Sequence, residues 1–238
     1  FFKILRAYND YRLEDLIDEK EKHFVVKSII KGLGHNFYED EQTIESIISE
    51  MSYIQNTLID VEDFKSSSVD NNIFKDIRRE YEKYKNINRK YDYDDMLSHC
   101  YKLLLNNEKI LDSIREKYKH ILIDEFQDIN KIQYEIMRMI AYPRNNIFIV
   151  GDDDQSIYSF RGADADIMFQ FSRTYKAVPK IILRYNYRSH RAIINSAMSL
   201  IGNNKNRYEK NFVTTKSMGI NPYVVRVEDF EEEAKVIS

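Results

Sequence analysis

Two adjacent carboxylates follow a short apolar run in the second half of the chain. The run is Ile121-Leu122-Ile123, and the carboxylates are Asp124 and Glu125. In a parallel sheet, functional groups gather beyond the carboxyl ends of the strands. One carboxylate of such a pair can hold Mg²⁺, directly or through water, while the other orients and deprotonates a water that attacks a phosphate. A lone Asp-Glu pair is more simply a solvated acidic turn, but the apolar run before this one argues for a site.

A second polar segment follows the apolar run Ile147–Val150. The amide of Gln155 can both donate and accept hydrogen bonds, so it could sense a phosphate or a positioned water. Tyr158, Phe160 and Arg161 bring aromatic faces and a cation close together, which is the chemistry of a platform for unpaired bases. Taken alone, the two aromatic residues fit ordinary core packing slightly better.

A third apolar run, Ile181–Leu183, is followed by Tyr187 and Arg188. The tyrosine can stack on a purine, and the arginine can neutralise charge that develops on a transferring phosphoryl group. A Tyr-Arg pair at the end of a strand is otherwise common. The pair therefore indicates a nucleotide site only in combination with the other two segments.

Strands that alternate with helices would position these side chains. Buried strands are predicted at 121–123, 147–150, 181–183 and 224–227, because each is a short apolar run. Asn130 with Gln133 forms a cap signal for one intervening helix, and Ser189 and Gly202 delimit another. The acidic run Glu231–Glu233 is interpreted as a solvated helix start. This alternation predicts a parallel sheet and hence an α/β fold.

The first half of the chain is predicted to be helical. It has no proline before Pro143, and its only glycines are Gly32 and Gly34. Two stripes with the helical period are interpreted as core: Ile44, Ile47, Ile48, Met51, Gln55 and Leu58, with one polar slip, and Met96, Leu97, Cys100 and Leu104. A basic stretch from Arg78 to Lys90, interleaved with tyrosines, could contact a nucleic acid strand. Because Glu80 and Glu82 interrupt it, a solvated, ion-paired helix is an equally good interpretation.

Composition narrows the class of protein without naming a function. The 238 residues are 43% hydrophobic and 32% charged, which suits one large or two modest globular domains. With 36 basic and 39 acidic residues the net charge is −3, so any nucleic-acid surface must be local. Cys100 is the only cysteine, which fits a reducing compartment, and no apolar run could span a bilayer. We therefore expect a cytoplasmic protein without a membrane partner, and both ends of the chain resemble cuts.

Together and in this order, the three segments resemble motifs II, III and IV of superfamily 1 DNA helicases of the UvrD/Rep/PcrA type. The resemblance runs from Tyr91-Asp92-Tyr93-Asp94-Asp95-Met96-Leu97 to about Ile201. It implies that Asp124 and Glu125 serve Mg²⁺ and water activation, and that Gln155 couples the nucleotide to DNA. It further implies that the chain uses ATP, with Tyr187 stacked on adenine and Arg188 at the γ-phosphate, and that single-stranded DNA contacts three residues: Tyr158, Phe160 and Arg161. Phe160 departs from the pattern, since helicases close to it commonly have tryptophan there, which leaves stacking possible over a smaller area.

The resemblance also implies a division of the chain. We expect residues 1–8 to end a first motor segment, 9–90 to form a helical insertion, 91–184 to belong to a RecA-like motor domain, and 185–238 to open a second one. The fold class is then a partial RecA-like parallel sheet of the P-loop NTPase type with a large all-helical insertion. No Gly-x-x-x-x-Gly-Lys-Ser/Thr phosphate loop occurs in these residues. We therefore predict that the fragment alone neither hydrolyses ATP nor unwinds DNA, whereas the complete protein would move 3′ to 5′ on single-stranded DNA.

Two other functions remain open on the sequence alone. A metal-dependent nuclease would use the acidic residues around paired cations, namely Asp124, Glu125, Asp128, Asp152, Asp153 and Asp154. That chemistry would not need Gln155, Tyr187 or Arg188. A non-catalytic module would bind single-stranded DNA or a partner protein through the helical half. Duplex junctions and repair or replication proteins are further expected partners of a helicase, but the sequence identifies none of them.

Overall fold

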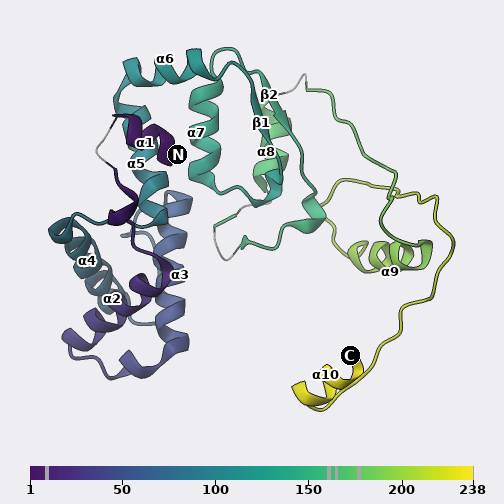
Figure 1. Cartoon of the computed structure of the whole chain (residues 1–238), viewed down its shortest axis with the longest axis horizontal. Coiled ribbons are helices and arrows are strands. Elements are labelled where there is room, and N and C mark those ends of the chain that lie inside the picture. Colours follow the sequence, from purple (N-terminus) through teal and green to yellow (C-terminus); the bar gives the residue numbers. More distant parts are fainter. Residues whose placement is uncertain (9–10, 160–161, 164–165, 176–177, 238) are drawn as a thin grey trace. The chain divides into compact units, whose positions relative to one another are not determined.

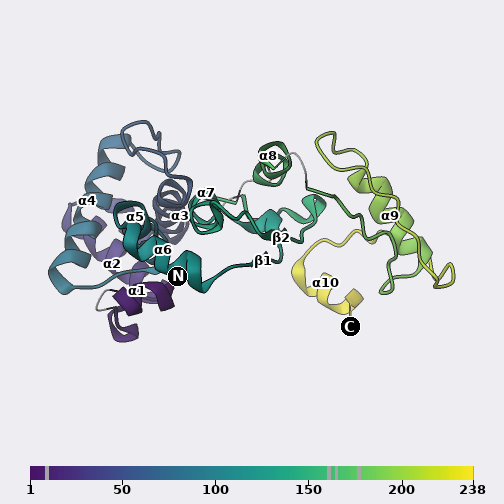
Figure 2. The same ribbon diagram turned by 90° about the horizontal axis from the view of Figure 1, so that it is seen from above.

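The chain forms two compact units, which we describe separately. The structure is a computed structural model that covers residues 1–238 and describes all of them except 9–10, 160–161, 164–165, 176–177 and 238. The first unit is Phe1–Lys176 and the second is Ala177–Ser238. Figures 1 and 2 show the first unit as a group of helices that continues into a small sheet.

Helices α2 (Glu19–Gly32), α3 (Glu41–Thr57) and α4 (Asn71–Asn88) pack side by side around one apolar core (Figure 1). Aspartates begin all of them, because the carboxylates of Asp18, Asp40 and Asp70 accept hydrogen bonds from backbone N–H groups of the first turn. The fully buried side chains include Val26, Ile44, Ile47, Phe74 and Ile77. Burial of this kind is worth about 1.5–3 kcal/mol for each large apolar side chain, so this core stabilises the helical half.

One of the two predicted apolar stripes needs correction. The buried face of α3 runs through Ile47, Met51 and Ile54, whereas Leu58 lies beyond the helix in a left-handed conformation and is 37% exposed. Gln55, the one polar residue in the predicted stripe, is not a core position. Its side-chain amide donates hydrogen bonds to Asp95 Oδ1 (3.0 Å) and Ser98 Oγ (2.9 Å). A side chain that bridges to a neighbouring helix thus interrupts the apolar pattern.

A buried network of charged side chains joins these helices to α5 (Tyr93–Asn106). Lys22 of α2 lies 3.1 Å from Asp92 and 2.9 Å from Asp94, and Lys85 of α4 lies 2.8 Å from Asp95. These two lysines are only 5% and 3% exposed. Buried charges are tolerated when each has a close partner of opposite sign, and these pairs meet that condition.

The same network decides between the two interpretations of the basic stretch. Lys85 is buried among carboxylates, and Lys90 pairs with Glu21 at 2.8 Å. On the outer face, Arg79 pairs with Asp76 and Lys83 with Glu80, each three residues apart. The stretch is therefore an ion-paired helix rather than an open basic face.

Helix α7 (Lys131–Ala141) connects two further cores through opposite faces. Ile132 and Ile136 pack with α1 (Phe2–Tyr8), α5 and α6 (Glu108–Lys117), in a cluster that includes the buried Cys100 and Leu104. Tyr134 and Met137 instead pack toward the sheet and α8 (Asp166–Thr174). The predicted cap is confirmed, since Asn130 and Gln133 exchange reciprocal side-chain to backbone hydrogen bonds.

The sheet consists of two parallel strands, β1 (Ile121–Ile123) and β2 (Ile147–Ile149), with Ile121 opposite Ile147. Two of the predicted strands are therefore confirmed, although Val150 lies just outside the second. The isoleucines of both strands pack toward Phe126 and α8, whereas Leu122 and Phe148 on the other face are 73% and 60% exposed. The sheet is thus covered on one face only.

The second unit contains α9 (Arg191–Ile201) and α10 (Phe230–Ile237). The strands predicted at 181–183 and 224–227 are wrong, because these described residues form no strand and Ile181, Leu183 and Val224 are 79%, 74% and 98% exposed. A strand persists when a neighbour bonds its backbone, and among the described residues of this unit only Tyr185 and Val213 form such a bridge. Gly202 ends α9 as expected, but His190 rather than Ser189 precedes its first turn. The acidic residues Glu231–Glu233 occupy the first turn of α10, as predicted. In the part of the chain that the structure describes, no helix is long and apolar enough to cross a bilayer.

Candidate nucleotide and DNA site

The ends of β1 and β2 bring two of the three polar segments together. Beyond the strands, Val150 N–H donates to Ile123 O (2.8 Å) and Phe126 N–H donates to Val150 O (2.9 Å). The residues after β1 and those after β2 therefore start from one shared edge. This is the edge of a parallel sheet at which ligands bind in α/β proteins.

Asp124 and Glu125 occupy the exit of β1, where both side chains are exposed. Glu125 has a positive φ of 50°, a left-handed conformation that is uncommon for residues other than glycine. Its N–H donates to Asp124 Oδ1 (2.9 Å), so the turn is held by the first carboxylate. Backbone strain of this kind costs on the order of 1–3 kcal/mol and concentrates at functional sites.

Gln127 ties this turn to the segment after β2, a role that sequence reasoning missed. Its side-chain Nε2 donates to Glu125 Oε2 (2.9 Å), and its Oε1 accepts from Asp152 N–H (2.9 Å). The residue is only 2% exposed. A single buried amide therefore holds both segments. The sequence feature that could have identified Gln127 is its place two residues after the candidate catalytic Glu125.

Gly151 permits this close approach. A Cβ at that position would lie 2.8 Å from Gln127 Oε1 and 3.1 Å from Phe126 N. Distances below 3.0 Å are not tolerated without movement of the neighbour. Glycine is required here because the backbone passes directly over the amide of Gln127.

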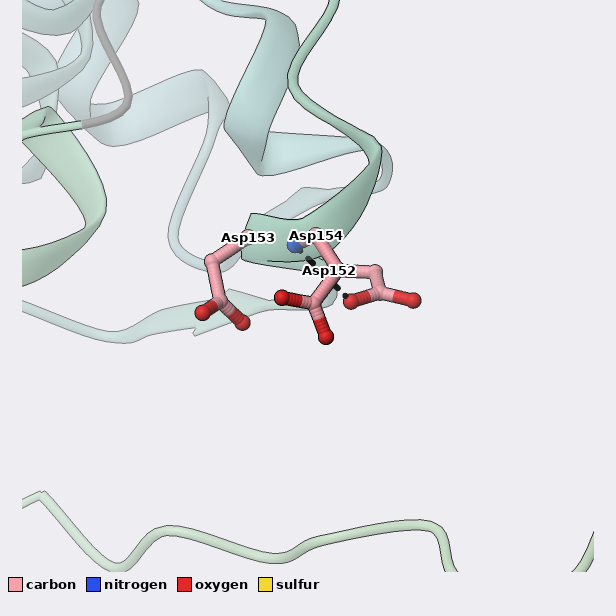
Figure 3. Close-up of side chains that lie close together, drawn as sticks. All are labelled: Asp152, Asp153 and Asp154. Carbon is pink, nitrogen blue, oxygen red and sulfur yellow. Dashed lines mark hydrogen bonds between the residues drawn. The ribbon is translucent and has the colours of Figure 1, made fainter. Parts of the chain in front are cut away.

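Asp152, Asp153 and Asp154 follow Gly151, with Asp153–Gln155 in a short helical turn. A carboxylate oxygen from each lies within 4.8 Å of the others, so hard-oxygen ligands for a cation gather there (Figure 3). Asp152 nevertheless also stabilises its own turn, because its oxygens accept from Asp154 N–H (3.2 Å) and from Gln155 Nε2 (2.7 Å). Gln155 itself is exposed at the same edge as Glu125.

The candidate DNA-binding residues are described only in part. Tyr158 is 38% exposed. Phe160 and Arg161 lie outside the described residues. The chain beyond them returns to the helices, since Ala163 forms an antiparallel bridge with Asn130 at the start of α7.

Tyr187 and Arg188 belong to the second unit. Tyr187 is 72% exposed and its ring stacks loosely on Tyr185, with centroids 6.3 Å apart. Asn186 shapes the turn, because its Oδ1 accepts from the N–H groups of Arg188 (3.0 Å) and Ser189 (2.9 Å). Both side chains are therefore presented to solvent on a defined turn.

The first unit is mostly helical with a small parallel sheet, and exposed carboxylates and a glutamine lie beyond its two strands, where α/β proteins bind their ligands. The chain belongs to the UvrD/REP helicase family, because residues 4–176 match the family described as UvrD/REP helicase N-terminal domain. The matched range contains the whole of the edge described above.

Individual relatives carry corresponding names. The chain is 32% identical over 244 aligned residues, 99% of its length, to a homolog of DNA helicase II from Mycoplasma capricolum. It is 32% identical over 86% of its length to the ATP-dependent DNA helicase PcrA of Bacillus subtilis, and 43% identical over 54% to DNA helicase II of Haemophilus influenzae. The matches span only 34%, 28% and 18% of these relatives. The chain thus corresponds to about a third of their length or less.

Proposed function

We propose that the protein containing these residues is an ATP-dependent DNA helicase that moves 3′ to 5′ on single-stranded DNA. The observation that carries the proposal is the shared edge, where Gln127 joins Glu125 to the segment that holds Gln155. A nucleotide-driven motor needs such a link between the group that activates water and the group that senses the bound strand. The named relatives and the family match support the DNA helicase part of this proposal.

Each side chain at the edge has a role that its geometry permits. Asp124 and Glu125 offer exposed carboxylate oxygens, which are the ligands that Mg²⁺ prefers, so they fit a site for Mg²⁺ with ATP. The bound cation would supply charge neutralisation on the phosphates. Glu125 is the candidate general base, and Gln127 holds it toward the segment after β2.

The remaining residues would bind the two ligands. Gln155 would couple the nucleotide to the bound DNA strand. Tyr158 would stack on a base of single-stranded DNA, together with Phe160 and Arg161. Tyr187 would stack on adenine, and Arg188 would contact the γ-phosphate.

The domain division expected from the sequence is part of the same proposal. Residues 1–8 and 91–184 would belong to a RecA-like first motor domain, 9–90 to a helical insertion and 185–238 to the second motor domain. We further propose that the fragment alone lacks ATPase activity, because its sequence contains no phosphate loop.

A metal-dependent nuclease has one observation in its favour, the gathering of Asp152, Asp153 and Asp154. We prefer the helicase because the hydrogen bonds of Asp152 shape the turn that presents Gln155, and because a nuclease leaves the link through Gln127 without a purpose.

The test is ATPase activity with and without single-stranded DNA, measured on the protein with its natural termini and on its Glu125→Gln variant. We expect DNA-stimulated hydrolysis that the substitution lowers by at least about 100-fold, the usual contribution of a positioned general base. Glu135→Gln is a matched control, because Glu135 pairs with Arg138 on the surface of α7. Nuclease activity without ATP, or no hydrolysis despite an intact phosphate loop, would overturn the proposal.

A further inference from the structure

Asn56, near the end of α3, contacts two parts of the first unit that are distant in sequence. Its side-chain Nδ2 donates to Asp94 Oδ1 (2.9 Å), which identifies the nitrogen of this amide because a carboxylate only accepts. On its other side, a Cβ added to Gly162 would lie 3.1 Å from the Cβ of Asn56. Asn56 is 5% exposed and thus fixed between these two neighbours.

Asp94, the hydrogen-bond partner of Asn56, is itself held in place by two further side chains. The other oxygen of Asp94 accepts from Ser52 Oγ (2.6 Å) and from Lys22 Nζ (2.9 Å), so it is bound to α2 and α3 at once. These groups are largely buried, which strengthens their electrostatic attraction. The position of the Asn56 side chain is therefore determined by the helical network.

The Gly162 side of Asn56 is the far end of the segment that follows β2. Gly162 has a φ of +81°, and a side chain there would be strained in addition to being crowded by Asn56. Its N–H donates to Ser159 O (2.9 Å), and the next residue, Ala163, pairs with Asn130. At the near end, Gln127 holds Asp152. Gln155 and Tyr158 thus lie on a segment that is anchored at both ends.

The polar contact that holds the Asn56 side chain lies on its nitrogen. Its Oδ1 is buried and accepts no hydrogen bond from the described residues. Among the described residues, the amide is therefore held by its hydrogen bond to Asp94.

We propose that Asn56 is a positioning residue that fixes the segment carrying Gln155 and Tyr158 against the helical network, so that single-stranded DNA can activate ATP hydrolysis. This inference rests on the function proposed above. Asn56 contacts neither ligand: it acts through Gly162 and Asp94. The helical half would then take part in coupling DNA binding to ATP hydrolysis, in addition to any direct contact with DNA.

The experiment uses the protein with its natural termini and measures ATPase rate as a function of the concentration of oligo(dT). Asn56→Ala removes the hydrogen bond to Asp94, and Asn56→Asp replaces the donor by a second carboxylate. For both variants we expect a loss of DNA stimulation of about tenfold, within the usual range of couplings between sites. The rate without DNA and the KM for ATP should change by less than about twofold.

Gln55→Ala is the matched control. Gln55 precedes Asn56 in the same helix and donates two hydrogen bonds into the same network, to Asp95 and Ser98. Its loss should lower the thermal unfolding midpoint by as much as Asn56→Ala does but leave DNA stimulation intact. The exchange variant Asn56→Asp/Asp94→Asn restores a donor and an acceptor at this contact, and should recover stimulation.

The outcomes separate this inference from the proposed function. If the unsubstituted protein shows no DNA-stimulated hydrolysis, both are overturned. If it is stimulated and the Asn56 variants are stimulated equally, only the positioning role is overturned. Equal losses of stimulation in Gln55→Ala and Asn56→Ala would also overturn it, because they would show a general structural effect.

Discussion

Replacement of Asp92 by asparagine should destabilise the first unit in a manner that depends on pH. Asp92 is 2% exposed and lies 3.1 Å from the Nζ of Lys22 and 3.9 Å from the Nζ of Lys85. Burial alone would raise the pKa of this carboxyl, but the two ammonium groups outweigh burial and lower the pKa from 3.8 to about 2. A difference of this size corresponds to roughly 2 kcal/mol of folding free energy at neutral pH.

The direction of the pH effect follows from the lowered pKa. Because the folded state binds the proton more weakly than the unfolded chain, the contribution of Asp92 is present above a pH of about 4 and disappears as the pH falls toward about 2. Asparagine can still cap α5 through its oxygen, as Asp92 Oδ1 does at Asp95 N–H (2.9 Å). Its NH₂ group then stands in place of Asp92 Oδ2, which accepts from Tyr81 Oη (3.1 Å) and pairs with Lys22. The substitution therefore removes the charge together with one acceptor, and only the loss of the charge depends on pH.

Urea denaturation between pH 2 and pH 7, followed by far-UV circular dichroism, measures this effect. We expect the loss of unfolding free energy in Asp92→Asn to be larger at pH 7 than at the acidic end of the series by roughly 2 kcal/mol. Glu62→Gln serves as a control, because Glu62 pairs with Lys75 at 2.6 Å but is 72% exposed, and exposed pairs contribute little. A loss that is the same at both ends of the pH range, or no loss at pH 7, would refute the electrostatic account.

Three further substitutions or reactions test other features. Gly151→Ala should lower the free energy of unfolding by about 1–3 kcal/mol, because the new Cβ displaces Gln127 Oε1 from its hydrogen bond with Asp152 N–H. Urea denaturation measures this loss, and an unchanged midpoint would contradict the close approach of Gly151 to Gln127. Cys100 should resist dithionitrobenzoate in the folded chain at pH 8 and react on unfolding, because burial raises the pKa of its thiol to about 11. Fast reaction under native conditions would contradict the burial of this thiol. Asn130→Ala should cost about 1 kcal/mol through loss of the capping box at α7, whereas Lys131→Ala, at an exposed neighbour, should leave the midpoint nearly unchanged.

The sequence predicted those elements whose signals are local. The capping box at Asn130 and the strands that begin at Ile121 and Ile147 are present, because a cap needs only its own turn and each strand pairs with the other. Runs 181–183 and 224–227 have the same apolar character but form no strand. Apolar composition shows that a segment would be stable as a strand if it were paired, and it says nothing about whether a partner is present.

The candidate site shows the same division. The sequence predicted Glu125 and Gln155 from their positions after apolar runs, and the structure places both at one edge, although their roles remain proposals. Gln127 and Asn56 escaped notice because their importance lies in contacts with residues 25 and 38 positions away. A buried amide that joins two segments has no local pattern by which to identify it.

The uncovered face of the sheet affects how this chain can be handled. Leu122 and Phe148 are paired in register on neighbouring strands and both are exposed, so they form one apolar strip along the ribbon. Among the described residues, no further strand pairs with either outer edge of this ribbon. Surfaces of this kind promote edge-to-edge association. A preparation of residues 1–238 alone should therefore bind apolar dyes and associate as its concentration rises. Charged substitutions at Leu122 and Phe148 should improve its recovery without changing the hydrogen bonds between Glu125, Gln127 and Asp152.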